Sequence, residues 1–316
     1  MKKTMIVVSM AAAATGLAAF SHAAENYPER SIEFIVPYGP GGGSDNVVRA
    51  LQPKIEEALD GTLVIRNVSG GGGAVGYNRA VNAAADGYTV TTPNNANFTL
   101  EGLGNVDFTY GDFEYIARVL VEPYILAVRQ NDDWTDFESL MESIEGGERL
   151  TVGFSGVGSS THVTAVAIGN ELGVDFNFIP YDGGSAAVSA AMGGHVDAVV
   201  LNPNEIMSAV DGGRLTPVLS TGEERANVFP DTPTMIELGY ELELNQWRGI
   251  AAPKGISQEI EDKWVEAVKQ AVADPAFQQF AEEGGSEVMP LYGDELDEFV
   301  RRTAELMIPI AESVQE

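Results

Sequence analysis

The chain has 316 residues, and its 47 acidic side chains against 18 basic ones give a formal net charge of −29. This charge excludes nucleic acids and anionic membranes as partners, because both would be repelled. The chain has no Cys and only three His, which excludes disulfides and thiolate metal sites and argues against an imidazole metal site, so we expect no metal and no cofactor.

Residues 1–23 are typical of a secretory signal peptide. Lys2 and Lys3 precede an apolar run from Met5 to Phe20, and Ser21 and Ala23 occupy the −3 and −1 positions of a cleavage site after Ala23. We therefore expect export to the periplasm, and the loss of two lysines takes the net charge from −29 to −31. Such a charge exceeds what solubility requires and predicts an acidic surface adapted to high salt.

Short runs of β-branched and aromatic residues alternate with helical segments in the remaining chain, a pattern typical of parallel α/β layers. Helices are predicted from Ser44, which is placed to cap the first, and from Ser257. The predicted strands are Ile32 to Pro37, Leu63 to Val68, Tyr88 to Thr92, Tyr115 to Val128, Leu150 to Phe154, Asn177 to Ile179, Ala198 to Leu201, Leu215 to Ser220 and Gly249 to Ala252.

Two long strand-like passages divide the chain, Tyr115 to Val128 and Leu242 to Ala252. About 290 residues is large for one core, so we interpret these passages as crossovers between two lobes. Residues 24–124 with 246–316 would form the first lobe, and 125–245 the second. Two crossovers make a hinge that lets the lobes close on a ligand.

Three glycine-rich loops, each between a strand and a helix, carry the predicted chemistry. They span residues 37–45, 155–162 and 181–185, and each ends with Ser or Thr at a helix start. Free backbone N–H groups, hydroxyls and the helix dipole together make an anion site there. None of these loops contains Lys or Arg, which favours a carboxylate over a phosphate.

Two other sequence patterns suggest functions that their surroundings do not support. Gly71 to Gly76 fit the G-x-G-x-x-G pattern, but the next strand ends in Pro93-Asn94 without an acid for a ribose, so we expect a loop at the pocket rim. A serine hydrolase using Ser155 or Ser159 with His162 is an alternative function. A helix N-terminus disfavours protonation of His162, which suits a neutral hydrogen-bonding role better than a general base.

At these loops the sequence resembles the substrate-binding family of tripartite tricarboxylate transporters, the TctC or Bug family, over essentially the whole mature chain. The residues that carry the resemblance are Ile35 to Tyr38 with Gly41, Gly42 and Asp45; Gly73 to Gly76; Ala84 to Thr89; Gly156 to His162; Tyr181 with Gly183 and Gly184; Gly193 to Asp197; Pro233-Thr234 with Glu237 to Tyr240; Trp247 to Gly249; and Ala252 to Gly255. The departures are Asp182, where the family often has a basic residue, and Gly39-Pro40 in the first loop.

The resemblance implies a type II periplasmic-binding fold that captures a small organic carboxylate and hands it to one large and one small membrane subunit. It implies no enzyme activity, and we expect a monomer; a ligand-sensing component of a signalling system is a second alternative. Arg248 could meet a second carboxylate or pair with acidic surface residues. The ligand-binding residues expected from the family and from position are Tyr38, Gly41, Gly42, Ser44, Asp45, Asn94, Asn97, Gly158, Ser159, Ser160, Thr161, His162, Tyr181, Gly184 and Asn202.

Overall fold

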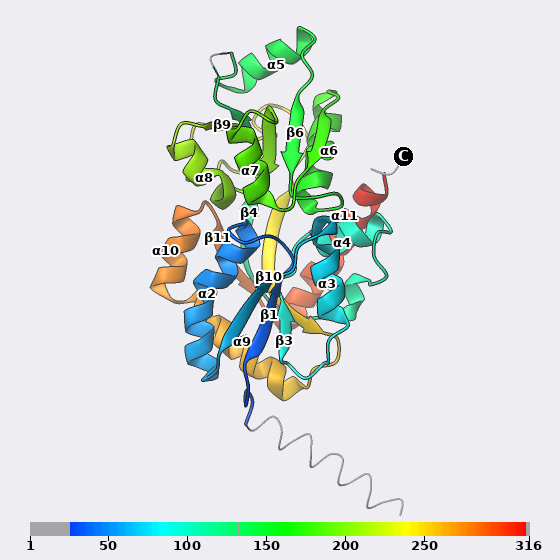
Figure 1. The fold of residues 1–316 in the computed structure, drawn as a ribbon, viewed down its shortest axis with the longest axis vertical. Coiled ribbons are helices and arrows are strands. Elements are labelled where there is room, and N and C mark those ends of the chain that lie inside the picture. The colour runs from blue at the N-terminus through cyan, green and yellow to red at the C-terminus, as the bar shows by residue number, and fades with distance from the viewer. Residues whose placement is uncertain (1–25, 132, 314–316) are drawn as a thin grey trace, which may run out of the picture.

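A computed structural model describes residues 26–131 and 133–313 and shows two α/β lobes, one above the other in Figure 1. The predicted signal peptide lies outside the described residues. Each lobe is built around its own sheet, and the chain passes between the sheets at β4 and β10. Within the described ranges, no helix is long and apolar enough to cross a membrane.

The first lobe contains a six-stranded sheet of order β11-β4-β10-β3-β1-β2. Its strands are β1 (Ile32–Val36), β2 (Leu63–Asn67), β3 (Thr89–Thr91), β4 (Phe113–Pro123), β10 (Asn245–Pro253) and β11 (Glu287–Leu291). β1 pairs in parallel with β2 and β3, whereas β10 and β11 run antiparallel to β4. The expectation of purely parallel layers was therefore wrong for the crossover strands.

The second lobe contains a five-stranded sheet of order β7-β6-β8-β5-β9. Its strands are β5 (Ile125–Arg129), β6 (Thr151–Phe154), β7 (Asn177–Pro180), β8 (Ala198–Leu201) and β9 (Leu215–Ser220). β5 runs antiparallel to both β8 and β9, and the other pairs are parallel. Alternate β5 residues pack into different clusters, Ile125 and Ala127 into one and Leu126 and Val128 into another, so both faces of this sheet are covered.

The first crossover is two strands rather than the single strand predicted from Tyr115 to Val128. Pro123 ends β4, and the buried Tyr124 separates it from β5 in the other sheet. Proline has no N–H to donate to a sheet ladder, which suits the position where a strand leaves its sheet. The Pro123 carbonyl instead accepts from Asn202 Nδ2 of the second lobe at 2.8 Å.

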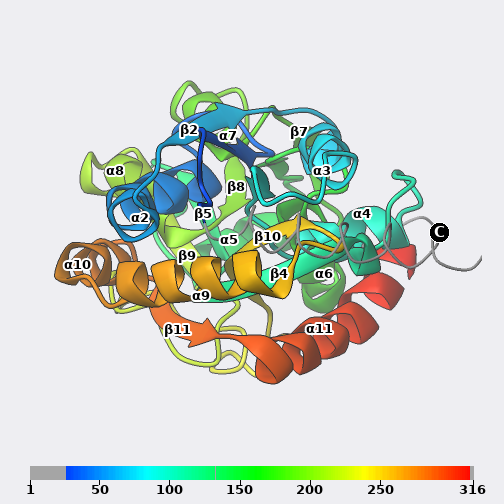
Figure 2. The ribbon, with the colours of Figure 1, turned by 90° about the horizontal axis from the view of Figure 1, so that it is seen from below.

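Helices cover both faces of the first sheet, as Figure 2 shows from below. α2 (Gly43–Leu59) packs against α9 (Gln258–Val272) on one face, while α11 (Gly293–Ser313) packs against α4 (Ala96–Gly102) on the other. Their buried residues recur every three or four positions, as with Val48, Leu51 and Ile55 in α2. The remaining helices of this lobe are α3 (Ala74–Val81) and α10 (Pro275–Glu283), with 3-10 turns at Gly71–Gly73 and Tyr110–Asp112.

The second sheet is covered by α7 (Gly184–Met192) and α8 (Pro203–Asp211) on one face and by α6 (Ser160–Leu172) and α5 (Phe137–Glu145) on the other. α6, α7 and α8 each follow a strand of the parallel part of the sheet. Their N-termini therefore lie at the carboxyl ends of those strands, on the side that faces the first lobe (Figure 1).

Candidate functional site

Helix starts from both lobes surround one cavity between the lobes. The first lobe contributes the start of α2, the second lobe contributes the starts of α6, α7 and α8, and the crossover strand β10 supplies one wall. The lining residues are Tyr38, Gly43, Ser44, Asn94, Ser155, Ser160, Thr161, Gly184, Asn202, Glu205, Gln246 and Arg248. The first and second glycine loops thus meet at one cavity, as the sequence predicted.

The start of α2 is shaped by glycine rather than by a serine cap. Gly42 is the N-cap and has no side chain to cap with, so the prediction that Ser44 caps this helix was wrong. Ser44 is instead the second helical residue, and its hydroxyl accepts from Arg248 Nη1 at 2.7 Å. Asp45 holds the loop in shape, because its carboxylate accepts from the backbone N–H of Gly41 at 2.9 Å.

The start of α6 has the serine cap that α2 lacks. Ser159 Oγ accepts from the backbone N–H of His162 at 3.2 Å. The Thr161 hydroxyl lies 2.7 Å from Ser155 Oγ and 2.9 Å from Ser159 Oγ, and Ser160 Oγ accepts from Gln246 Nε2 at 2.8 Å. Across the described chain, the backbone N–H groups of Ser160 and Thr161 have no acceptor.

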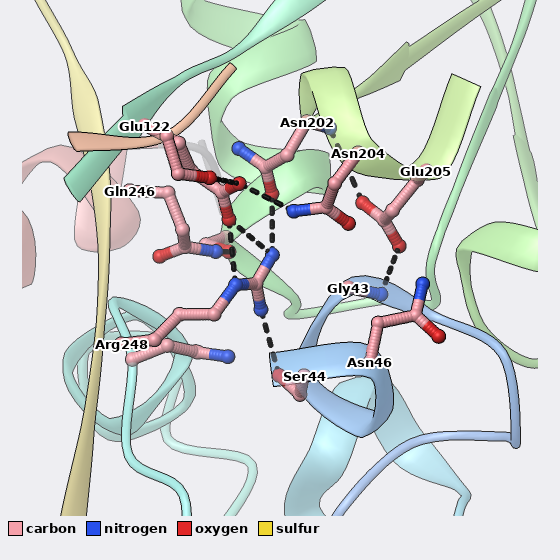
Figure 3. A network of polar contacts seen from close by, with 12 residues as sticks. Gly43, Ser44, Asn46, Glu122, Asn202, Asn204, Glu205, Gln246 and Arg248 are labelled. Atoms are coloured by element: carbon pink, nitrogen blue, oxygen red, sulfur yellow. Dashed lines mark hydrogen bonds and ion pairs between the residues drawn. The ribbon is translucent and has the colours of Figure 1, made fainter. Parts of the chain in front are cut away.

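Arg248 is the centre of a buried polar network, drawn in Figure 3. Its Nε donates to Glu122 Oε1 at 2.6 Å, and its Nη2 donates to Asn202 Oδ1 at 2.9 Å. Glu122 also accepts from Asn204 Nδ2 at 2.6 Å and from Ser286 Oγ at 3.0 Å. Arg248 is 3% exposed and Glu122 1% exposed, so this pair belongs to the interior and not to the acidic surface.

The pKa values of this pair follow from its burial. Burial raises the pKa of Glu122, and the opposing charge of Arg248 reduces that rise without cancelling it. Burial lowers the pKa of Arg248, but the charges of Glu122 and Glu205 outweigh this effect and raise it. The guanidinium is therefore charged and already neutralised by the protein's own carboxylates.

Glu205 connects the two lobes. It stands in the first turn of α8, and its Oε1 accepts from the backbone N–H of Gly43 at the start of α2, at 3.1 Å. Its Oε2 accepts from the backbone N–H of Asn202 at 3.2 Å, which completes a capping box. A Cβ added to Gly184 would collide with Glu205 Oε1, so Glu205 also lies against the start of α7.

The cleft is closed around this network. The cavity has a volume of about 20 Å³, enough for about one water molecule. A second, more open cavity of about 270 Å³ adjoins it and shares Tyr38 and Ser155. The glycines from Gly70 to Gly73 line this second cavity, where the sequence placed them at the rim.

The structure divides the predicted ligand-binding residues into two groups. Those that line the first cavity are Tyr38, Ser44, Asn94, Ser160, Thr161, Gly184 and Asn202, and Tyr181 lines the second. Those that line neither cavity are Gly41, Gly42, Asp45, Asn97, Gly158, Ser159 and His162. Asn97 supports the site indirectly, since its Oδ1 accepts from the backbone N–H of Asn94 at 3.1 Å.

Five lining residues were not among the predicted set: Gly43, Ser155, Glu205, Gln246 and Arg248, of which the sequence had offered Arg248 only as an alternative contact. Glu205 could have been found, because Asn202 followed three residues later by Glu is a capping-box signature directly after a strand. Gln246 gave no such signal. It enters the site because β10 crosses between the lobes, where Gln246 Oε1 accepts from the backbone N–H of Asn95 at 3.1 Å.

The geometry at His162 does not form a catalytic dyad. Its Nδ1 accepts from the backbone N–H of Gly158 at 3.3 Å, and its ring stacks on Phe154 with centroids 4.6 Å apart. Burial lowers the pKa of His162. No hydrogen bond in the described chain joins the imidazole to Ser155 or Ser159 Oγ, and no group of three His, Cys, Asp or Glu among these residues could hold a metal ion.

Comparison with known proteins identifies relatives over nearly the whole chain. A family model described as the tripartite tricarboxylate transporter family receptor, TctC, matches residues 47–315. Protein BugT of Bordetella pertussis is 28% identical over 297 residues, which cover 92% of this chain and 90% of BugT.

Solved structures share the fold. The periplasmic binding protein BugD superposes with a TM-score of 0.86 at 28% identity and covers 91% of this chain and 98% of its own. MatC from Rhodopseudomonas palustris, solved with bound malate, superposes with a TM-score of 0.84 at 24% identity and covers 90% of this chain and 100% of its own.

Proposed function

Since this chain belongs to the tripartite tricarboxylate transporter receptor family, whose members are periplasmic solute-binding proteins, we propose that it captures a small organic carboxylate between its lobes. The mechanism is binding in the open cleft followed by lobe closure, which buries the ligand. The closed form then presents one surface to a large and a small membrane subunit, which take the carboxylate across the membrane.

The observation that carries this proposal is a set of backbone donors around one cavity. The N–H groups of Ser44, Ser160, Thr161 and Gly184, at the starts of α2, α6 and α7, have no acceptor among residues 26–131 and 133–313. Helix starts favour negative charge, and amide and hydroxyl donors can hold a carboxylate without a cation. MatC, which was solved with bound malate, shares this fold.

A thermal-shift screen tests the ligand class. Mono-, di- and tricarboxylates, aromatic acids and amino acids are each compared with the neutral amide of the same acid. A ligand at 100 times its Kd raises the unfolding free energy by about 2.7 kcal/mol, so the right acid raises Tm and its amide does not. Stabilisation by neutral sugars or by cations, with no response to any acid, would contradict the proposal.

The remaining parts of the proposal concern processing and domain boundaries. We propose cleavage after Ala23, lobes formed by 24–124 with 246–316 and by 125–245, and a monomeric mature protein. N-terminal sequencing of the exported protein and its sedimentation in solution test the first and last. A hydrolase is disfavoured by the position of His162, and the absence of turnover of any ester would remove it.

A further inference from the structure

The charges that face the cleft suggest which kind of carboxylate enters it. Among the described residues that line the first cavity, Arg248 is the only cation and Glu205 the only anion. Arg248 is committed to the protein: Nε and Nη2 bind Glu122, Nη1 binds Ser44 and Nη2 also binds Asn202, which leaves one of its five N–H groups free. A second carboxylate on the ligand would therefore find no uncommitted cation.

Glu205 is held differently, because no Lys or Arg of the described chain forms an ion pair with it. Both of its observed partners are neutral backbone N–H groups, those of Gly43 and Asn202. A carboxylate has about four acceptor positions, so Glu205 keeps capacity for further donors. It also fills the space between the starts of α2 and α7, which leaves the start of α6 as the open place for a ligand carboxylate.

A second unsatisfied acceptor lies next to Glu205. Asn204 Oδ1 is buried and has no hydrogen-bond partner, while its Nδ2 is fixed by Glu122. A Cβ built on Gly43 would lie 3.1 Å from this oxygen, which places it beside the α2 start. In the adjoining cavity, Asp182 is the only charged lining residue within the described chain, and its one observed side-chain partner there is the neutral Ser69 hydroxyl at 2.9 Å.

We propose that the ligand is an amino carboxylate, with its carboxylate at the start of α6 and its ammonium group bound by Glu205. This inference rests on the proposed function and narrows its ligand class. An ammonium group has three donors and no acceptor, which matches the free acceptor positions on Glu205, the one of these two side chains that lines the cavity. A dicarboxylate would instead place a second negative charge beside Glu205, where like charges repel.

Matched ligand pairs test the inference by titration calorimetry on the full mature protein. Glutarate is compared with 4-aminobutyrate, succinate with 3-aminopropionate and lactate with alanine. The two members of each pair have the same carbon chain between the groups compared. They differ only in that an ammonium group replaces the second carboxylate or, in alanine, the hydroxyl. The amino member of at least one pair should bind about 10- to 100-fold more tightly, the range of a hydrogen bond to a charged group. Equal or tighter binding of the non-amino member in all pairs would overturn the inference.

A substitution of Glu205 tests whether this residue causes the preference for the amino member of each pair. Glu205→Gln should remove most of the preference for the amino member, whereas Asp211→Asn, which removes an exposed charge at the far end of the same helix, should leave it intact. An unchanged preference in Glu205→Gln would overturn the assignment. If that variant does not fold, the wild-type pairs alone still decide the ligand class. If wild type binds no carboxylate of any kind, the proposed function itself has failed.

Discussion

At the scale of single residues, the site depends on an ion pair that is almost completely buried. Arg248 and Glu122 are each at most 3% exposed and are held by Ser44, Asn202, Asn204 and Ser286. Such a pair adds little net stability compared with apolar residues of the same size, but removing one partner leaves a buried charge. The pair therefore fixes the position of β10 against both lobes. Breaking it should lower the free energy of unfolding strongly.

Replacing Arg248 alone should show this asymmetry. Arg248→Met is expected to lower the free energy of unfolding by about 3–5 kcal/mol at pH 7, and the double variant with Glu122→Gln should recover part of that loss. Urea unfolding followed by circular dichroism measures both. An Arg248→Met variant as stable as wild type would contradict the role given to the pair.

The same variant has a predicted pH dependence. Without Arg248, burial raises the pKa of Glu122 further, so the folded state binds the proton more tightly than the unfolded state does. Stability then falls as pH rises through that raised pKa, and the deficit of Arg248→Met should shrink as the pH is lowered from 7 towards 5. A deficit that grows at low pH would contradict this.

The contribution of Asp45 to stability should have the opposite pH dependence. Burial raises its pKa, but hydrogen bonds from Arg49, the Gly41 N–H and Asn67 outweigh that effect and lower it. Its contribution is therefore present above the unfolded pKa of about 3.9 and is lost as the pH falls through the folded value. Asp45→Asn should cost about 1–3 kcal/mol at pH 7, and the difference from wild type should decrease between pH 5 and pH 3 in urea unfolding.

At the scale of elements, several strands and the helices that follow the glycine loops could be predicted from local pattern. β1, β2 and β8 lie where β-branched runs predicted them, within one residue at each end. β11 was missed because Glu287 to Leu291 is only partly buried and contains a proline, which is tolerated at the edge of a sheet. The antiparallel direction of β4 and β10 is set by long-range pairing, which no local pattern records.

In the site too, local sequence features could be predicted and long-range contacts could not. Glycine loops and helix starts are local features, so Ser44, Ser160 and Thr161 were identified from sequence. Gln246 lines the cavity only because β10 crosses between the lobes, whereas Glu205 had a local signal in its capping box with Asn202. Arg248 was singled out from sequence, but its buried partner Glu122 is 126 positions away along the chain.

Loop contact between the lobes makes closure sensitive to a single methyl group. Gly72, in the turn before α3, faces the second glycine loop, and a Cβ on it would collide with the Val157 carbonyl and lie 2.7 Å from the Ser159 nitrogen. The Thr99 hydroxyl donates to the Gly158 carbonyl at 2.7 Å across the same gap. These contacts join the two lobes in the arrangement seen here.

Gly72→Ala should therefore weaken ligand binding by hindering closure. Both Gly72, at a φ of +67°, and Gly104, at +61°, have left-handed backbone, but Gly104 has open space around its Cβ position. Gly104→Ala thus controls for backbone strain. We expect at least about a tenfold loss of affinity in Gly72→Ala, mainly through faster ligand release, and little change in Gly104→Ala. Equal losses in the two variants would attribute the effect to strain alone.

At the scale of the whole molecule, charge is the most unusual property. A net charge of −29 repels itself in the compact state, and the exposed ion pairs offset only part of that repulsion. Added salt should therefore stabilise the fold, since the screening length falls from about 10 Å at 0.1 M to about 3 Å at 1 M. We expect Tm to rise between 0.1 M and 2 M KCl, and a flat Tm would contradict adaptation to high salt.

The two lobes meet around neutral hydrogen-bond donors at the helix starts. Closure brings the start of α2 against the starts of α6, α7 and α8, so a ligand must enter before the lobes meet in the arrangement seen here. In the proposed mechanism, the carboxylate supplies the negative charge that the unpaired N–H groups of α6 lack, and its binding favours the closed form.

Calorimetric titration of one acid and its amide into wild type and into a Thr161→Val, Ser160→Ala variant tests this claim most directly. The acid that stabilises the protein most in the screen should bind wild type at least about 100-fold more tightly than its amide does. The double variant removes two hydroxyls but keeps the backbone N–H groups of α6, so it should lose only part of that difference. Equal binding of acid and amide by wild type would contradict a carboxylate site at the start of α6.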